Sequence, residues 1–219
     1  MNKKNSLILA LDVLSRDKAL ELTEQLVDHF DAIKVGYPLI LHAGLGIVEE
    51  ISSISPVIAD LKIADTPNTN RLICEAVLGA GADAIIAQAF PGKDSLVACA
   101  DCARGFGADL FVVTEMSHPG ADQFMAPLAE RMARLAVESG ARGVVAPATR
   151  PERIRLIRSI IGDKLIISPG VGAQGGSAGE ALQAGADYLI VGRSVYGSAD
   201  PVAQAKELAA QVEQSRRSN

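Results

Sequence analysis

The chain has 219 residues, a formal net charge of −5 and 48% hydrophobic residues, few of them aromatic. That length is enough for one large domain with a substantial core, so we expect residues 1–219 to form a single domain. An acidic chain without a basic patch argues against a nucleic-acid partner, and no stretch approaches the roughly 18 apolar residues of a membrane span.

Short apolar runs alternate with longer amphipathic runs along the chain. The apolar runs predict strands over Ser6–Leu11, Ala32–Val35, Val57–Ile63, Ala84–Phe90, Leu110–Thr114, Gly143–Ala146, Leu165–Ser168 and Tyr188–Val191. The amphipathic runs predict about eight helical segments, among them Arg16–His29, Thr69–Leu78, Asp94–Gly105, Gln123–Glu138, Pro151–Ile160 and a last helix from about Pro201. The polar tails, residues 1–5 and 214–219, are expected to fray.

A weak internal repeat marks three of the expected helix-to-strand junctions. The junctions are Gly79–Ala84, Ser139–Gly143 and Gln183–Tyr188, and each places a glycine where a helix should end. Glycine enters the left-handed conformation of a helix end at little cost. An open doubly wound sheet would also alternate strands with helices, but eight regular units favour closure. The sequence therefore predicts an α/β fold, a single (β/α)8 TIM barrel.

Three charges interrupt the apolar segment that begins at Val57. They are Asp60, Lys62 and Asp65, and a further lysine, Lys34, ends the preceding strand. Removing an ion from water costs several kcal/mol unless it is paired. Because side chains alternate along a strand, Asp60 and Lys62 should point to the same side. This Asp-Lys-Asp array with a second lysine is typical of an active site.

Polar residues also collect where the other predicted strands end. They include Asp12, Lys34, Thr114, Glu115, Ser117 and Arg193. The carboxyl ends of all eight strands meet at one face of such a barrel, which is where these barrels carry out their chemistry. A Gly-rich segment, 168–176, follows the seventh strand, and Gly192-Arg193 follows the eighth. Together they predict a phosphate site with a loop long enough to close over a ligand.

The remaining motifs give weaker indications of function. Cys99 and Cys102 form a C-x-x-C within an ordinary amphipathic helix, without the second pair that a zinc site needs. With Cys74 the cysteines number three, which favours a reduced, cytoplasmic compartment over a disulfide scaffold. His118 lies in a turn, where a structural role is more common than acid–base catalysis. No cluster of His, Cys and carboxylate side chains predicts a metal.

These motifs resemble the orotidine 5'-phosphate decarboxylase family, in its shorter, archaeal-like type. The matching segments run in order along nearly the whole chain: Leu9–Asp12, Ile33–Gly36, Asp60–Thr69, Thr114–Gly120, Ser168–Gly176 and Val191–Ser194. The resemblance implies a cofactor-free homodimer that turns orotidine 5'-monophosphate into uridine 5'-monophosphate and carbon dioxide, the last step of de novo pyrimidine synthesis. One departure is Gln88, where many relatives would have a histidine.

The resemblance also implies residue roles. Lys62 would protonate C6 of the pyrimidine beside Asp60, while Lys34 and Asp65 complete the charge array. Asp65 and Thr69 would reach the partner subunit's site, and Asp12 would hold ribose hydroxyls. The remaining substrate contacts that it implies are Ser117 and Gln174 at the base, Gly192 and Arg193 at the phosphate, and the loop residues Pro169, Gly170, Val171, Gly172, Ala173 and Gly175.

Two other functions compete with this one. A magnesium-dependent sugar-phosphate decarboxylase or aldolase of the same barrel superfamily also carries the D-x-K-x-x-D strand. Such enzymes would have a glutamate metal ligand where this chain has Lys34, and a lysine repels a cation. A non-catalytic phosphate-binding barrel would keep Arg193 and the Gly-rich segment, but it has no need of Asp60 and Lys62 together.

Overall fold

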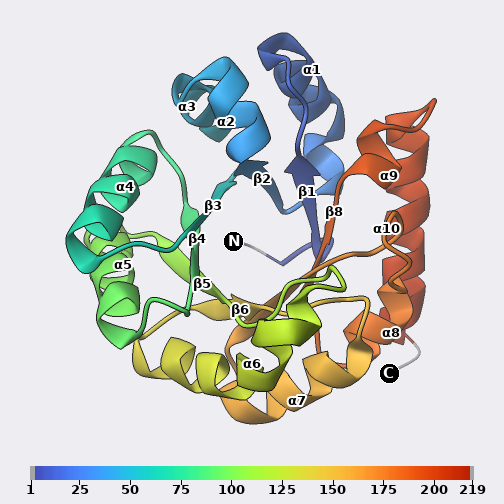
Figure 1. Cartoon of the computed structure of the whole chain (residues 1–219). Coiled ribbons are helices and arrows are strands. Elements are labelled where there is room, and N and C mark those ends of the chain that lie inside the picture. The colour runs from blue at the N-terminus through green and yellow to red at the C-terminus, as the bar shows by residue number, and fades with distance from the viewer. Residues whose placement is uncertain (1–2, 218–219) are drawn as a thin grey trace.

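Eight parallel strands close into a barrel in chain order, and β1 pairs with both β2 and β8 (Figure 1). The computed structural model describes residues 3–217. The strands are β1 (Leu7–Leu11), β2 (Ala32–Gly36), β3 (Val57–Ile63), β4 (Ala84–Gln88), β5 (Asp109–Val113), β6 (Gly143–Val145), β7 (Leu165–Pro169) and β8 (Tyr188–Val191). The predicted (β/α)8 barrel is confirmed. That residues 1–219 form one domain stays a prediction, and Met1, Asn2, Ser218 and Asn219 lie outside the described residues.

Helices surround the barrel and cover its strands (Figure 1). They are α1 (Arg16–Leu26), a 3-10 helix η1 (Val27–His29), α2 (Tyr37–Ala43), α3 (Gly46–Ser52), α4 (Pro67–Gly79), α5 (Lys93–Gly105), α6 (Ala121–Glu138), α7 (Pro151–Ile161), α8 (Ala178–Gln183), α9 (Arg193–Tyr196) and α10 (Pro201–Arg217). The described chain thus has more helical segments than predicted, because two short helices join β2 to β3 and α9 precedes α10. None of the helices in residues 3–217 is long and apolar enough to cross a membrane.

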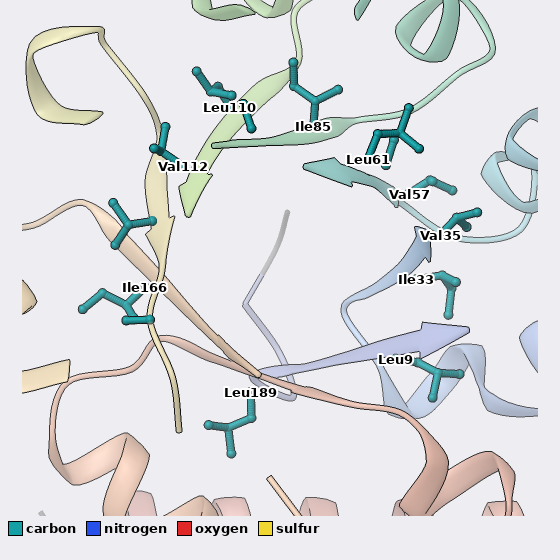
Figure 2. Packing of buried hydrophobic residues seen from close by; sticks show 14 of the residues in the cluster. Leu9, Ile33, Val35, Val57, Leu61, Ile85, Leu110, Val112, Ile166 and Leu189 are labelled. Atoms are coloured by element: carbon teal, nitrogen blue, oxygen red, sulfur yellow. The ribbon is translucent and has the colours of Figure 1, made fainter. Parts of the chain in front are cut away.

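Alternation along the strands builds two separate cores. One lies between barrel and helices and includes Leu9, Ile33, Val35, Val57, Leu61, Ile85, Leu110, Val112, Ile166 and Leu189, whose side chains point away from the barrel axis (Figure 2). The other fills the barrel interior and includes Ile8, Ile58, Ile86, Phe111 and Tyr188. Nearly all of these side chains are fully buried. This packing fixes the strands whose carboxyl ends carry the polar residues.

Two strands, β3 and β8, have the predicted ends, and the ends of the others differ from the prediction by one or two residues. The largest difference is at β4, which was expected to reach Phe90 but ends at Gln88. The backbone N–H of Gly92 donates to the carbonyl of Ala89 at 3.0 Å, and this turn leads the chain into α5. A local turn therefore overrides the apolar pattern that continues to Phe90.

The described parts of both polar tails have hydrogen-bond partners elsewhere in the chain, and the expectation that the tails fray stays a prediction. The carboxylate of Asp31 accepts hydrogen bonds from the backbone N–H groups of Lys4, Asn5 and Ser6, at 2.7 to 3.1 Å. At the other end, α10 continues to Arg217, and Arg216 donates to the carbonyl of Lys4 at 3.2 Å. Polar sequence at a terminus did not reveal these long-range partners.

Candidate active site

A cavity of about 280 Å³ opens where the carboxyl ends of the strands meet. The predicted site residues that line it are the polar residues Asp12, Lys34, Asp60, Lys62, Ser117, Gln174 and Arg193, together with Gly192. The predicted loop residues Pro169, Gly170, Val171 and Ala173 line it as well. Residues from β1, β2, β3, β5, β7 and β8 or their following loops thus converge on one cavity, as the position of strand ends predicted.

Asp60 lies between two lysines. Lys62 Nζ is 3.0 Å from both carboxylate oxygens of Asp60, and Lys34 Nζ is 3.0 Å from Asp60 Oδ2. The side chains of Lys34 and Asp60 are only 10% and 7% exposed, whereas that of Lys62 is 37% exposed. The prediction that Asp60 and Lys62 share a face of β3 is confirmed, and the charges are mutually paired.

This pairing keeps both buried groups charged. Burial alone would lower the pKa of Lys34, but the negative charges of Asp60 and Asp12 outweigh it, so the pKa is raised above its ordinary value. Burial alone would raise the pKa of Asp60, but Lys34 and Lys62 outweigh it, so this pKa is lowered. At neutral pH the cavity therefore presents an aspartate and a lysine that stay ionised despite their burial.

Asp12 adds a second, more exposed carboxylate to the array. Its Oδ1 lies 3.9 Å from Lys34 Nζ, and its side chain is 43% exposed. A Cβ at Gly36 would lie 3.3 Å from Asp12 Oδ1 and 3.6 Å from Lys34 Nζ, so another residue there would require the Asp12 carboxylate to shift by a few tenths of an ångström. Asp12 thus has free accepting capacity at the rim of the cavity, as a group that holds hydroxyls requires.

The Gly-rich loop after β7 lies against the loop that carries Ser117. Gly170 has a φ of 104°, a left-handed conformation that favours glycine. A Cβ there would lie 3.2 Å from Gln174 Oε1, 3.3 Å from Ser117 Cβ and 3.0 Å from Thr149 Cγ2. The absence of a side chain at Gly170 therefore lets Ser117 and Gln174 approach each other across it.

The phosphate end of the predicted site is formed by the start of α9. Gly192 precedes this helix, Arg193 is its first residue, and both line the cavity. Gly172 and Gly175, which were also expected to contact substrate, belong to the loop but do not line the cavity. A Cβ at Gly172 would instead meet Ser194 Oγ at 3.1 Å.

Asp65 and Thr69 are the other predicted residues that do not line the cavity. Asp65 is exposed, and its Oδ1 accepts the backbone N–H of Thr66 at 2.6 Å. Its own backbone N–H donates to Asn70 Oδ1, and its carbonyl accepts the hydroxyl of Ser95. These bonds fix the turn from β3 into α4. Asp65 does not reach the lysines of its own chain in this arrangement.

Sequence reasoning missed the apolar wall of the cavity. Ile86, Val113, Val145 and Ile190 line it from inside the barrel, together with Met116 from the loop after β5. Their signal was present in the period-two pattern, because Val113, Val145 and Ile190 occupy the last inward position of their strands and Ile86 occupies the inward position before Gln88. A wall of this kind excludes water beside the charged array.

The charge distribution also indicates whether the cavity could bind a metal ion. In the part of the chain that the structure describes, no group of three or more His, Cys, Asp or Glu side chains is placed to hold a metal ion. Lys34 Nζ lies between the carboxylates of Asp60 and Asp12, the two acids that would otherwise attract a cation. An ammonium group therefore occupies the place that a divalent ion would need, which disfavours the magnesium-dependent alternative.

Comparison with known proteins gives a consistent result. Curated relatives named orotidine 5'-phosphate decarboxylase include one from Methanococcoides burtonii, 60% identical over 95% of this chain and 97% of its own length. Another, from Methanosarcina barkeri, is 58% identical over 97% of both chains.

Solved structures agree with the sequence relatives. The orotidine 5'-monophosphate decarboxylase of Methanocaldococcus jannaschii, complexed with the inhibitor BMP, is 45% identical, with a TM-score of 0.90 over 94% of this chain and 97% of that one. A family model described as "Orotidine 5'-phosphate decarboxylase / HUMPS family" matches residues 5–208. The chain belongs to the orotidine 5'-phosphate decarboxylase / HUMPS family.

Proposed function

We propose that this chain decarboxylates orotidine 5'-phosphate to uridine 5'-phosphate in pyrimidine nucleotide synthesis. One observation carries the proposal: an ammonium group, Lys62 Nζ, is held 3.0 Å from both oxygens of Asp60 in a cavity that Arg193 and the Gly-rich loop also line. The reaction needs a proton donor beside the departing carboxylate and an anchor for the phosphate, and this arrangement supplies both. The curated relatives carry the same activity in their names.

Lys62 is the proton donor in this proposal. Breaking the bond between C6 and the carboxylate releases carbon dioxide and leaves an electron pair on C6 in the plane of the ring. The ammonium group of Lys62 stabilises that pair and transfers a proton to it, giving uridine 5'-phosphate and a neutral amine that solvent reprotonates. Asp60 and Lys34 hold the donor in place, and Ile86 and Val113 keep water from the reacting carbon.

Magnitudes indicate which effect dominates. A substrate carboxylate about 4 Å from Asp60 would feel roughly 4 kcal/mol of repulsion at an effective dielectric constant near 20. A very slow uncatalysed reaction needs roughly 20 kcal/mol of barrier lowering. Repulsion of the ground state is therefore too small to be the main contribution. Stabilisation of the developing carbanion, with binding of the remote phosphate, must supply most of the rest.

Binding of the substrate is assigned to the rim of the cavity. The guanidinium of Arg193 and the backbone at Gly192 would hold the phosphate, Asp12 the ribose hydroxyls, and Ser117 with Gln174 the base. Ser117 and Gln174 both lie next to Gly170. The Gly-rich loop therefore brings its Gln174 side chain close to the segment that carries Ser117, which supports closure of this loop over the base. Pro169, Val171 and Ala173 would complete the cover.

A spectrophotometric assay tests the activity. Purified protein should convert orotidine 5'-phosphate with the same turnover before and after treatment with a chelator, because no metal or organic cofactor takes part. The rival function makes the opposite prediction. Turnover that the chelator abolishes and magnesium restores would reject the proposal in favour of a metal-dependent sugar-phosphate enzyme.

We further propose that the active unit is a homodimer whose subunits share their sites. Asp65 and Thr69 lie outside the cavity of their own chain. Large apolar side chains are exposed on the same chain segments and their neighbours: Leu72 lies on α4 with Thr69, Phe90 lines a surface pocket together with Asp65, and Leu41 is exposed on α2. Figure 1 shows that α2, α3 and α4 are neighbours around the barrel. A partner that covers this face would bury those side chains and receive Asp65 at its own Lys62.

Mixing two inactive variants tests the shared site. With Asp65 acting across the interface, a heterodimer of Lys62→Ala and Asp65→Ala has one site with both changes and one intact site. Random exchange makes half of the molecules heterodimers, so activity should recover to about a quarter of wild type. If exchange is confirmed by differently tagged subunits and no activity returns, Asp65 acts within its own chain or not at all.

A cytoplasmic location belongs to the same proposal. Cys74, Cys99 and Cys102 are all free thiols, and Cys102 is partly exposed. Free thiols of this kind are usual in reducing compartments and unusual in secreted proteins. Fractionation of the source cells with an antibody to the chain measures the location directly.

A further inference from the structure

The backbone at Lys62 has an unusual conformation. Lys62 has a φ of 43°, and only one other non-glycine residue in the described chain, Ser6, has a positive φ. Left-handed backbone costs a residue with a Cβ free energy that glycine does not lose. Ser6 lies just before β1, whereas Lys62 lies within the strand β3. The conformation is therefore imposed at this residue.

A change of register accompanies it. Ala59 of β3 pairs with Ile85 of β4, but the next partners are Ile63 and Ala87. Four steps along β3 thus correspond to two along β4, so β3 carries two extra residues between these pairs. The insertion is even, so Ile63 still faces the outer core while Lys62 faces the cavity. The extra residues form a bulge that contains Lys62.

The bulge explains how the two charges meet. In a regular strand, residues two apart are separated by more than 6 Å along the chain axis, and long side chains stand roughly perpendicular to the sheet. Here Lys62 Nζ reaches both oxygens of Asp60 at 3.0 Å. A left-handed residue inside a bulge shortens the segment and turns the lysine side chain back over its neighbour.

The surrounding core holds this conformation in place. Leu61, between the two charged residues, is buried among the residues that separate barrel from helices, and Ile63 is buried in the same layer. Both side chains anchor the bulge on its outer side while the charges project inward. A strained conformation persists where its surroundings determine it more strongly than its own preference does.

We propose that the left-handed backbone at Lys62 is a positioning device that sets the ammonium group over Asp60 and lowers the stability of the fold. Leu61 is the positioning residue that anchors it. The inference rests on the proposed role of Lys62 as proton donor only where turnover is measured. The strain itself is a property of the fold, and it can be measured without substrate.

Thermal unfolding of paired variants tests the strain. Glycine should be more stable than alanine at position 62, with a Tm higher by about 2–4 °C, because only alanine retains the strain. Lys34 is the matched control: it is a lysine that also contacts Asp60 from within a strand, with no positive φ. There the order should reverse, with Lys34→Gly less stable than Lys34→Ala. Equal Tm values at position 62, or a lower one for glycine, would overturn the proposal.

The turnover of a Leu61 variant tests whether Leu61 positions Lys62. Leu61→Ala should lower kcat about 10- to 100-fold with KM within about threefold, because a small displacement of a reacting group is costly. Leu110→Ala removes a buried leucine from the same core layer on β5, so it controls for lost packing and should retain kcat. If both variants retain kcat, Leu61 does not position Lys62. If wild type lacks decarboxylase activity, the proposed function fails, and the Tm comparison still decides the strain.

Discussion

Two buried carboxylates, one within β3 and one just beyond β5, each lie between two cations. Asp60 of β3 is paired with Lys34 and Lys62. Glu115, two residues after β5, is paired with Arg150 and Arg153. Both side chains are withdrawn from water, with 7% of Asp60 and 0% of Glu115 exposed. Burial and charge alone do not distinguish them.

Their partners do. Arg153 Nε donates to Glu115 Oε2 at 2.7 Å, and Arg150 Nη2 lies 2.8 Å from Oε1 in an ion pair without hydrogen-bond geometry. The same arginines donate to the carbonyls of Met116 and Ala126, at 2.7 and 2.8 Å. Arginine does not deprotonate in proteins, and its planar donors fix several acceptors at once. The cluster around Glu115 therefore ties the loop that carries Met116 to α6 and α7.

The cluster around Asp60 has a different chemistry. A lysine can lose its proton, and Lys62 is partly exposed to the cavity. Its ammonium group has three N–H donors. Two of them donate to Asp60, so one remains for another acceptor. The difference between the clusters teaches that the type of cation and its access to a cavity separate the proposed catalytic carboxylate from a structural one.

The largest effect should follow from replacing Lys62 beside Asp60 with arginine, the type of cation that surrounds Glu115. Lys62→Arg keeps the charge but removes a proton that can be transferred, so turnover should fall by more than about 10,000-fold, as for Lys62→Ala. Affinity for uridine 5'-phosphate should change by less than about tenfold in either variant, because the proposed binding contacts are mainly Arg193 and the Gly-rich loop. Steady-state kinetics and calorimetry measure the two. A tenth of wild-type turnover in Lys62→Arg would remove Lys62 from its role.

Neutralising each carboxylate should separate activity from stability. Glu115→Gln leaves two arginines without their buried partner, so the free energy of unfolding should fall by about 3 kcal/mol or more. Asp60→Asn should lower it by less, because Lys62 is 37% exposed and Lys34 keeps Asp12 at 3.9 Å, whereas Arg150 keeps only the exposed Asp122 and Arg153 pairs with no other carboxylate among the described residues. Turnover should show the opposite order, with the greater loss in Asp60→Asn. Urea unfolding and kinetics at a temperature where both variants are folded check this, and the same order in both measurements would contradict the distinction.

The sequence predicted the architecture well because the fold rests on local patterns. The strand Val57–Ile63 was predicted with its observed ends, and the shared face of Asp60 and Lys62 followed from period two. The pairing of Glu115 with Arg150 could not be predicted, because its partners are more than 30 residues apart and no periodicity links them. The positive φ at Lys62 could not be predicted either, because the bulge depends on pairing with β4 and the residue type gives no sign of it.

The smallest expected effect concerns the pH range over which the Asp60 cluster stays charged. The pKa of Asp60 is lowered from 3.8, so its contribution to stability is present above 3.8 and is lost as the pH falls through the folded-state pKa. The pKa of Lys34 is raised from 10.5, so its contribution is present below 10.5 and is lost as the pH rises through the folded-state pKa. The cluster therefore keeps its charges throughout the neutral range.

Comparison of wild type with Lys34→Met measures this window. The difference in free energy of unfolding should vary by less than about 1 kcal/mol between about pH 5 and 9, because neither group titrates there in the folded or unfolded state. Above pH 10.5 the difference should shrink, since wild type loses a charge that the variant never had. Glu115→Gln is the control, because its partners are arginines that stay charged, so its difference from wild type should not shrink there. A difference between wild type and Lys34→Met that changed steadily through neutrality would mean that Lys34 is not held as a cation by Asp60.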